Sequence, residues 1–309
     1  MGDILRWLRS PGRAIVLVLC AALAGLAADA GRPPGPVEPF VKELLYVPAD
    51  GGNYYVAVGV LRPSGIGPYG AIVLNHGTPA TVAERNAESP AAFFHAATEF
   101  ARRGYAVFMP LRRGYGATGG AFAEDAGSCA APRYASAERA AAQDVLAAYE
   151  FARGRPYVDS RRMILAGQSA GGVAALQAAA YHPEGLVAVL AFAAGRGGDP
   201  YGTPGVPCAG AALGELFADL GAAVRVPVLL QYAQNDRFFG PQASQEWFSR
   251  FKSAGAKAEY VLQPPFGRDG HFLLTDPSGT SVWLPAVERF LERYGVPFAP
   301  PSTEGAQKA

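Results

Sequence analysis

One serine between two glycines is the clearest candidate for chemistry in this chain. Ser169 stands in GQSAG, after the apolar run MILA and before the helix-forming run AGGVAALQAAA. The G-x-S-x-G pattern alone is weak evidence, but a strand before it and a helix after it are typical of the sharp turn that displays a nucleophile. The sequence therefore predicts Ser169 as a nucleophile. The alternative is a small residue where a strand meets a helix.

A serine hydroxyl is a poor nucleophile unless a base takes its proton, and four histidines could supply that base. His76 ends a predicted strand, while His95 and His182 fall on predicted helices and are expected to be ordinary helix residues. His271 lies late in the chain, in the loop FGRDGHFLL that follows the last predicted strand. This position predicts His271 as the base.

An acid is needed to hold the imidazole tautomer and to stabilise the imidazolium. Asp236 ends the strand-like run VPVLLQYAQND, so its carboxylate is expected at the carboxyl edge of the sheet. Asp269 stands only two residues before His271, which is an awkward spacing, and Asp199 and Asp219 fall in a stretch that we expect to be irregular. We therefore predict Asp236 as the acid, with capping of the next helix as its alternative role.

Two backbone N–H groups are candidates to bind the oxyanion. Ala170 begins the helix after the serine, where its N–H is free to donate. Thr78 lies in NHGTPAT, the loop after the third predicted strand, where a second donor is expected. The alternative for the Thr78 loop is a plain turn that ends a strand.

These residues need a scaffold of alternating strands and helices, and the remaining sequence predicts one. The expected strands lie at 42–50, 54–61, 70–77, 105–114, 162–168, 186–195, 226–236 and 258–263. The expected helices lie at 89–104, 135–154, 169–183, 241–255 and 280–295. Such alternation forces mostly parallel pairing with helical crossovers. The predicted fold class is α/β, with a mostly parallel eight-stranded sheet and helices on both faces.

This domain is expected to span residues 41–298, with two short irregular insertions at 116–136 and 196–223 and a disordered tail at 299–309. Each insertion holds one cysteine, Cys129 and Cys208. The third cysteine, Cys20, lies in the predicted leader at 1–30, so two cysteines remain after its removal. An even number of cysteines in an exported chain permits one disulfide, and two unpaired buried thiols are the alternative.

The N-terminus predicts export to the periplasm or the medium. Three arginines precede an uncharged apolar run at 14–28, which ends in the small-residue site ADA. This order is typical of a signal peptide, here residues 1–30, followed by a Pro/Gly-rich linker at 31–40. The apolar run has about 15 residues, fewer than the roughly 20 that span a bilayer as a helix. An uncleaved N-terminal anchor is the alternative.

Several motifs together resemble the α/β-hydrolase superfamily. HGT, RRGYGATGG, GQSAGG, QND and DGHF occur in that order, and the resemblance covers roughly residues 45–295. The nearest branches are the dienelactone-hydrolase-like and prolyl-oligopeptidase-like enzymes. Dienelactone hydrolases proper use a cysteine nucleophile, so Ser169 is a departure that favours esterase or peptidase-like chemistry. The run RRGYG at 112–116 resembles a segment near the site in related hydrolases; we assign it no catalytic role and expect a loop with arginine in solvent.

The expected function is hydrolysis of carboxylic esters through a Ser-His-Asp triad and an acyl-enzyme, without metal or organic cofactor. The alternatives are a peptidase or amidase with the same triad, and a non-catalytic secreted binding protein. The expected partner is a small-molecule ester, with no stable membrane insertion after removal of the signal peptide. Basic and acidic residues balance to a net charge of +1, which disfavours nucleic acid as a partner. The sequence leaves the oligomeric state open.

Overall fold

The structure is a computed structural model that describes residues 39–298 of the 309-residue chain. The predicted signal peptide at 1–30 and tail at 299–309 lie outside the described residues, as does most of the predicted linker. The linker prediction is wrong at its end, because Phe40 already belongs to the first strand.

Eight strands form one sheet in the order β1-β2-β4-β3-β7-β8-β9-β10. The six strands from β4 to β10 in this order pair in parallel, and β1 and β2 join them by antiparallel pairing. The strands are β1 (Phe40–Ala49), β2 (Tyr54–Pro63), β3 (Tyr69–Asn75), β4 (Tyr105–Leu111), β7 (Val158–Gln168), β8 (Leu186–Phe192), β9 (Val228–Ala233) and β10 (Ala258–Gln263). The prediction of a mostly parallel eight-stranded sheet is confirmed.

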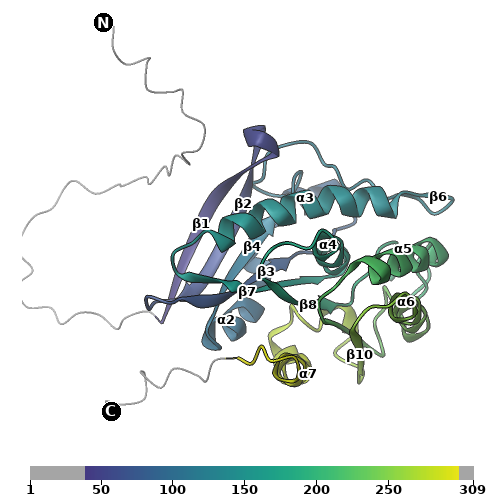
Figure 1. Ribbon diagram of the computed structural model, residues 1–309. Coiled ribbons are helices and arrows are strands. Elements are labelled where there is room, and N and C mark those ends of the chain that lie inside the picture. Colours follow the sequence, from purple (N-terminus) through teal and green to yellow (C-terminus); the bar gives the residue numbers. More distant parts are fainter. Residues whose placement is uncertain (1–38, 299–309) are drawn as a thin grey trace, which may run out of the picture. The chain divides into compact units, whose positions relative to one another are not determined.

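Helices cover both faces of this sheet (Figure 1). Side chains of α3, α4, α5 and α6 pack into one apolar core, and those of α2 and α7 pack into a second core on the other face. Their bounds are α2 (Phe94–Arg102), α3 (Tyr134–Arg153), α4 (Ala170–Ala179), α5 (Gly210–Ala223), α6 (Pro241–Ser253) and α7 (Thr280–Arg293). All five predicted helices are present.

The second insertion was expected to be irregular, and that prediction is wrong for its latter half. Residues Gly210–Ala223 form α5, a helix of 14 residues that packs against α6. The first insertion holds only the two-residue strands β5 (Gly127–Ser128) and β6 (Ala131–Pro132). A short helix, α1 (Val82–Asn86), which was not predicted, follows the loop after β3.

A disulfide joins Cys129 of the first insertion to Cys208 of the second, with 5.3 Å between their Cα atoms. The sequence favoured this bridge over two free thiols. It connects residues separated by 79 positions and so links two segments that the sheet alone would not hold together.

All strands that pair in parallel present their carboxyl ends at the same edge of the sheet. Ser169 follows β7, Thr78 follows β3, Asp236 follows β9 and His271 follows β10. The topology therefore gathers the predicted site residues at one edge. Within residues 39–298 no helix has both the length and the apolar character needed to span a membrane.

Candidate active site

Ser169 occupies a sharp, strained turn between β7 and α4. Its φ of 58° and ψ of −128° lie where L side chains are crowded, and it forms the N-cap of α4. A Cβ at Gly167 would lie 2.2 Å from the carbonyl oxygen of Gly171, and one at Gly171 would lie 2.3 Å from the carbonyl oxygen of His76. The two glycines of GQSAG are therefore required by close backbone approach at this turn.

His271 and Asp236 form a buried pair. The imidazole Nδ1 lies 3.2 Å from each carboxylate oxygen of Asp236, and the two residues are only 4% and 3% exposed. Asp236 Oδ1 also accepts from the backbone N–H groups of Phe238 at 2.8 Å and Phe239 at 2.9 Å. These bonds fix the carboxylate so that it can hold one orientation of the imidazole ring.

Neighbouring groups restrict the position of His271. The Phe238 ring stacks on the imidazole with 4.1 Å between ring centroids. Gln168, the residue before Ser169, donates from Nε2 to the carbonyl oxygen of His271 at 2.7 Å. Across the described residues no hydrogen bond joins Ser169 Oγ to His271. In unliganded hydrolases such bonds are often long and tighten when substrate binds.

The loop after β3 approaches Ser169 closely. A Cβ at Gly77 would lie 3.1 Å from Ser169 Cβ and 3.6 Å from Ser169 Oγ. Along the described chain, neither the Thr78 N–H nor the Ala170 N–H donates a hydrogen bond to another protein group. Both donors predicted for the oxyanion are thus free to bind a ligand beside the serine.

The acids that were alternatives to Asp236 lie in other settings. Asp269 Oδ1 accepts from the backbone N–H groups of Arg237 and His271, each at 3.0 Å, and so caps the turn that carries the histidine. Asp199 caps a loop turn through the N–H groups of Tyr201 and Gly202, and Asp219 lies on α5.

The other three histidines take no part in this arrangement. His95 Nε2 lies 2.7 Å from Thr280 Oγ1, between α2 and α7, and His182 is exposed at the end of α4. His76 is buried: its Nδ1 donates to the carbonyl oxygen of Gly77 at 2.7 Å and its Nε2 accepts from the N–H of Arg112 at 3.1 Å.

A buried charge network lies beneath the loop after β3. Arg112 and Arg196 both pair with Glu124, and Arg196 pairs also with Glu138. Arg196 Nη1 and the Glu124 carboxylate each lie 3.3 Å from Thr78 Oγ1. Arg112 is fully buried, so the expectation that this arginine lies in solvent is wrong. It is held inside because only there can its guanidinium meet Glu124 and the carbonyl oxygens of the loop.

The network also sets unusual protonation states. Burial alone would raise the pKa of Glu124, but the charges of Arg112 and Arg196 outweigh it and hold that pKa well below its usual range. Burial raises the pKa of Glu138 despite its contact with Arg196. Burial, aided by the charge of Arg112, lowers the pKa of His76 to about 3, so His76 is neutral at ordinary pH.

The sequence missed the residues that support the site. Arg112, Glu124 and Arg196 come from three separate segments, and no local spacing signals that they meet. Gln168 does carry a signal in the sequence, because a polar amide at the end of a buried strand must find a hydrogen-bond partner.

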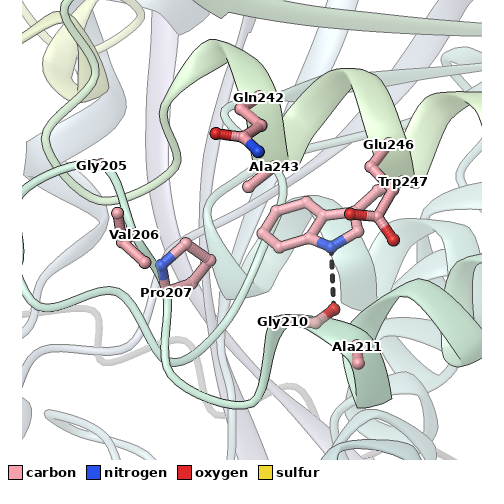
Figure 2. Close-up of a pocket in the computed structure, with 9 residues that line it drawn as sticks. All are labelled: Gly205, Val206, Pro207, Gly210, Ala211, Gln242, Ala243, Glu246 and Trp247. Atoms are coloured by element: carbon pink, nitrogen blue, oxygen red, sulfur yellow. Dashed lines mark hydrogen bonds between the residues drawn. The ribbon is translucent and has the colours of Figure 1, made fainter.

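An open pocket lies between α5 and α6, and Figure 2 shows the side chains around it. Trp247 forms part of its wall, and its indole Nε1 donates to the carbonyl oxygen of Gly210 at 3.0 Å. Gly205, on the rim, bonds through its carbonyl oxygen to the N–H of Gly240 at 2.9 Å. The pocket therefore adjoins the loop that follows Asp236, but neither Ser169 nor His271 lines it. In the part of the chain that the structure describes, no cluster of three His, Cys, Asp or Glu side chains is placed to hold a metal ion.

Solved structures with the same fold place this arrangement among known proteins. An acetyl xylan esterase from Paenibacillus sp. R4 aligns over 85% of this chain and 87% of its own, with a TM-score of 0.58 and 16% identity. A protein from Klebsiella pneumoniae assigned as a dienelactone hydrolase aligns over 84% of this chain and 99% of its own, with a TM-score of 0.55 and 16% identity. The chain is an α/β-hydrolase by fold. An acylaminoacyl peptidase from Pyrococcus horikoshii aligns with 88% of this α/β-hydrolase, at a TM-score of 0.58 and 17% identity, and the match covers 45% of the peptidase.

A family model described as the prolyl oligopeptidase family matches residues 91–196 of this α/β-hydrolase, roughly a third of the chain. The matched segment runs from just before α2 to the residues just after β8 and includes Ser169. A search of curated proteins found no match. The predicted α/β-hydrolase fold is confirmed, and the family match over residues 91–196 supports the prediction of a serine hydrolase.

Proposed function

We propose that this chain is an exported serine hydrolase that cleaves carboxylic ester bonds through Ser169, His271 and Asp236. The observation that carries the proposal is the buried pair of Asp236 and His271, tied through Gln168 to the residue before a strained serine. A buried carboxylate–imidazole pair beside a partly exposed turn serine is the arrangement by which a hydroxyl becomes a nucleophile.

In the proposed reaction, His271 takes the proton of Ser169 as Oγ attacks the ester carbonyl carbon. The N–H groups of Thr78 and Ala170 donate to the oxyanion of the tetrahedral intermediate, and Asp236 stabilises the imidazolium. The C–O bond to the alcohol then breaks, and His271 returns its proton to the leaving oxygen. Water, deprotonated by His271, then attacks the acyl carbon. The bond between that carbon and Ser169 Oγ breaks, Oγ takes the proton back from His271, and the acid is released.

A fluorophosphonate probe tests this proposal because it phosphonylates only an activated serine. The wild-type chain is expected to be labelled once, at Ser169, whereas Ser169→Ala is expected to be unlabelled and to lose ester hydrolysis at least about 1,000-fold. Ser253→Ala, which changes an exposed serine at the end of α6, is the control and is expected to behave as wild type. A wild-type chain that is not labelled would favour the non-catalytic binding protein instead.

Peptide or amide hydrolysis is the second candidate, and the family match favours it, since the matching model is that of a peptidase family. The same triad serves both reactions, so the site alone does not separate them. Rates on an ester and an anilide with the same acyl group separate the two, and a higher kcat/KM on the anilide would replace the esterase proposal.

Export of the chain rests on the leader-like residues 1–30 and is supported by the Cys129–Cys208 bond, because disulfides persist in oxidising compartments. Protein recovered from a secreting bacterial host is expected to begin at Gly31 and to show no free thiol at Cys129 or Cys208. Intact-mass measurement before and after alkylation checks both. A chain that keeps residues 1–30 would point to an anchor.

A further inference from the structure

Most hydrogen bonds to the loop that carries His271 come from the segment after β9, which carries Asp236. The N–H of Gly270 donates to the carbonyl oxygen of Asn235 at 3.2 Å, and the Asn235 amide donates to the carbonyl oxygen of Phe266 at 3.1 Å. Arg237 N–H donates to Asp269 at 3.0 Å. All of these bonds join the segment after β10 to the segment after β9. They fix His271 relative to Asp236, and none of them reaches the strand that precedes Ser169.

Gln168 supplies the link to the serine side. Among the described residues, its bond of 2.7 Å to the His271 carbonyl oxygen is the only hydrogen bond between the β7–α4 unit, residues 158–179, and the loop at 264–276. Gln168 is 6% exposed and ends the strand that delivers Ser169. Loss of this bond would leave both the buried amide and the carbonyl oxygen without a partner, which is costly. The bond therefore holds the loop at a fixed distance from the strand.

This placement has a geometric consequence. Gln168 and Ser169 are adjacent residues at the end of β7. The Gln168 amide therefore positions the histidine loop relative to the same strand end that positions the serine hydroxyl. A bond at Asp236 orients the imidazole ring, and a bond at Gln168 sets how far that ring stands from the strand. Proton transfer between Ser169 and His271 is sensitive to that separation.

We propose that Gln168 is a positioning residue that fixes the separation of Ser169 and His271 by tethering the histidine loop to the end of β7. The inference rests on the proposed function of these two residues. Gln168 itself touches neither substrate nor reacting atoms in this proposal, since its amide is engaged with the His271 carbonyl.

Gln168→Met tests the tether, because methionine keeps the length and apolar body of the side chain and removes the donor. Gln231→Met is the matched control: Gln231 is also buried, donates to the Trp283 carbonyl oxygen at 3.3 Å and accepts from the Gln263 side chain at 2.6 Å. Among the described residues, no hydrogen bond joins Gln231 to the loop at 264–276. For Gln168→Met we expect kcat and the second-order rate of fluorophosphonate labelling to fall about 10- to 100-fold, with KM within about two-fold of wild type. Gln231→Met is expected to keep both rates within about two-fold.

A second readout separates positioning from a general loss of structure. The Nδ1–H proton shared by His271 and Asp236 is expected to keep its low-field NMR resonance in Gln168→Met, because the bonds to the acid side remain. Gln168→Asn, which keeps the amide but shortens its reach, is expected to lose activity as Gln168→Met does. It serves as the test if the methionine variant does not fold.

The outcomes distinguish the tether from the triad. A reactive wild type with unchanged rates in Gln168→Met and Gln168→Asn would overturn the positioning role alone. Equal losses in Gln168→Met and Gln231→Met would assign the effect to packing and overturn it as well. A wild type that does not react with the fluorophosphonate would overturn the proposed function, and the positioning role would go with it.

Discussion

At the scale of single residues, the turn around Ser169 is limited by backbone contact. Gly167 and Gly171 leave no room for a side chain, and Gly77 faces the serine across the gap between two loops. These contacts explain why a short motif with two glycines predicted a sharp turn between a strand and a helix at this position. A serine in this strained conformation requires flanking glycines, because a Cβ at either position would clash with nearby backbone atoms.

Gly77→Ala tests whether this close approach matters for the reaction. The added Cβ would lie 3.1 Å from Ser169 Cβ, so the serine or the loop must move by a few tenths of an ångström. We expect kcat/KM for an ester to fall about 10-fold or more, while the free energy of unfolding changes by less than about 2 kcal/mol. Ester kinetics and denaturant unfolding on the same samples check both.

Gly119→Ala is the control for that variant. Gly119 lies in the first insertion, is exposed, and has no atom within 4 Å of the position that a Cβ would occupy. Its alanine variant is expected to match wild type in rate and stability. Wild-type kcat/KM in Gly77→Ala would mean that the loop after β3 does not need its present position beside Ser169.

At the scale of elements, the sequence predicted all eight strands of the sheet and five of its helices, because apolar runs bounded by glycine and proline are strong local signals. It missed α5, whose residues include Gly210, Gly214 and Gly221. Glycine disfavours a helix in isolation, but here it permits close packing. A Cβ at Gly221 would lie 2.1 Å from the carbonyl oxygen of Phe251 on α6. Tertiary contact therefore decides this helix, and no window of sequence contains that contact.

The two insertions also depend on contacts that local sequence does not reveal. Each was located from the chain pattern, but their connection depends on residues far apart in sequence. The Cys129–Cys208 bond joins them covalently, and Glu124 of the first pairs with Arg196 of the second. A crosslink across 79 positions stabilises a fold by about 4.5 kcal/mol in the chain-entropy model. The Glu124–Arg196 pair also contacts the hydroxyl of Thr78, the proposed oxyanion residue.

At the scale of the whole molecule, ionisable groups are buried where the loops after β3, β4 and β8 meet. Burial of paired charges is compensated only while each partner keeps its charge, and burial of a neutral histidine only while it stays neutral. The protonation state of these groups is therefore part of the stability of the fold. Among these groups, His76 titrates closest to neutral pH in the unfolded chain, where its pKa is about 6.5.

His76 should make the folded state sensitive to acid. Its pKa is lowered to about 3 in the fold, so between pH 6.5 and 3 the unfolded chain binds one proton more than the folded chain does. Its contribution to stability is complete above pH 6.5 and is lost as the pH falls, with a slope of at most about 1.4 kcal/mol per pH unit. The raised pKa of Glu138 acts in the opposite direction, so a comparison between variants is needed to isolate the histidine.

His76→Gln removes this titration and leaves the carboxyl groups in place. The free energy of unfolding of wild type minus that of the variant is expected to fall by about 1 kcal/mol per pH unit from pH 6 to pH 4.5, and to be constant above pH 7.5. Urea unfolding at a series of pH values measures it. Parallel curves for the two proteins over the whole range would mean that His76 is protonated as easily in the fold as outside it. The loop after β3 would then stand open to water, and Thr78 could not be held there by buried charges.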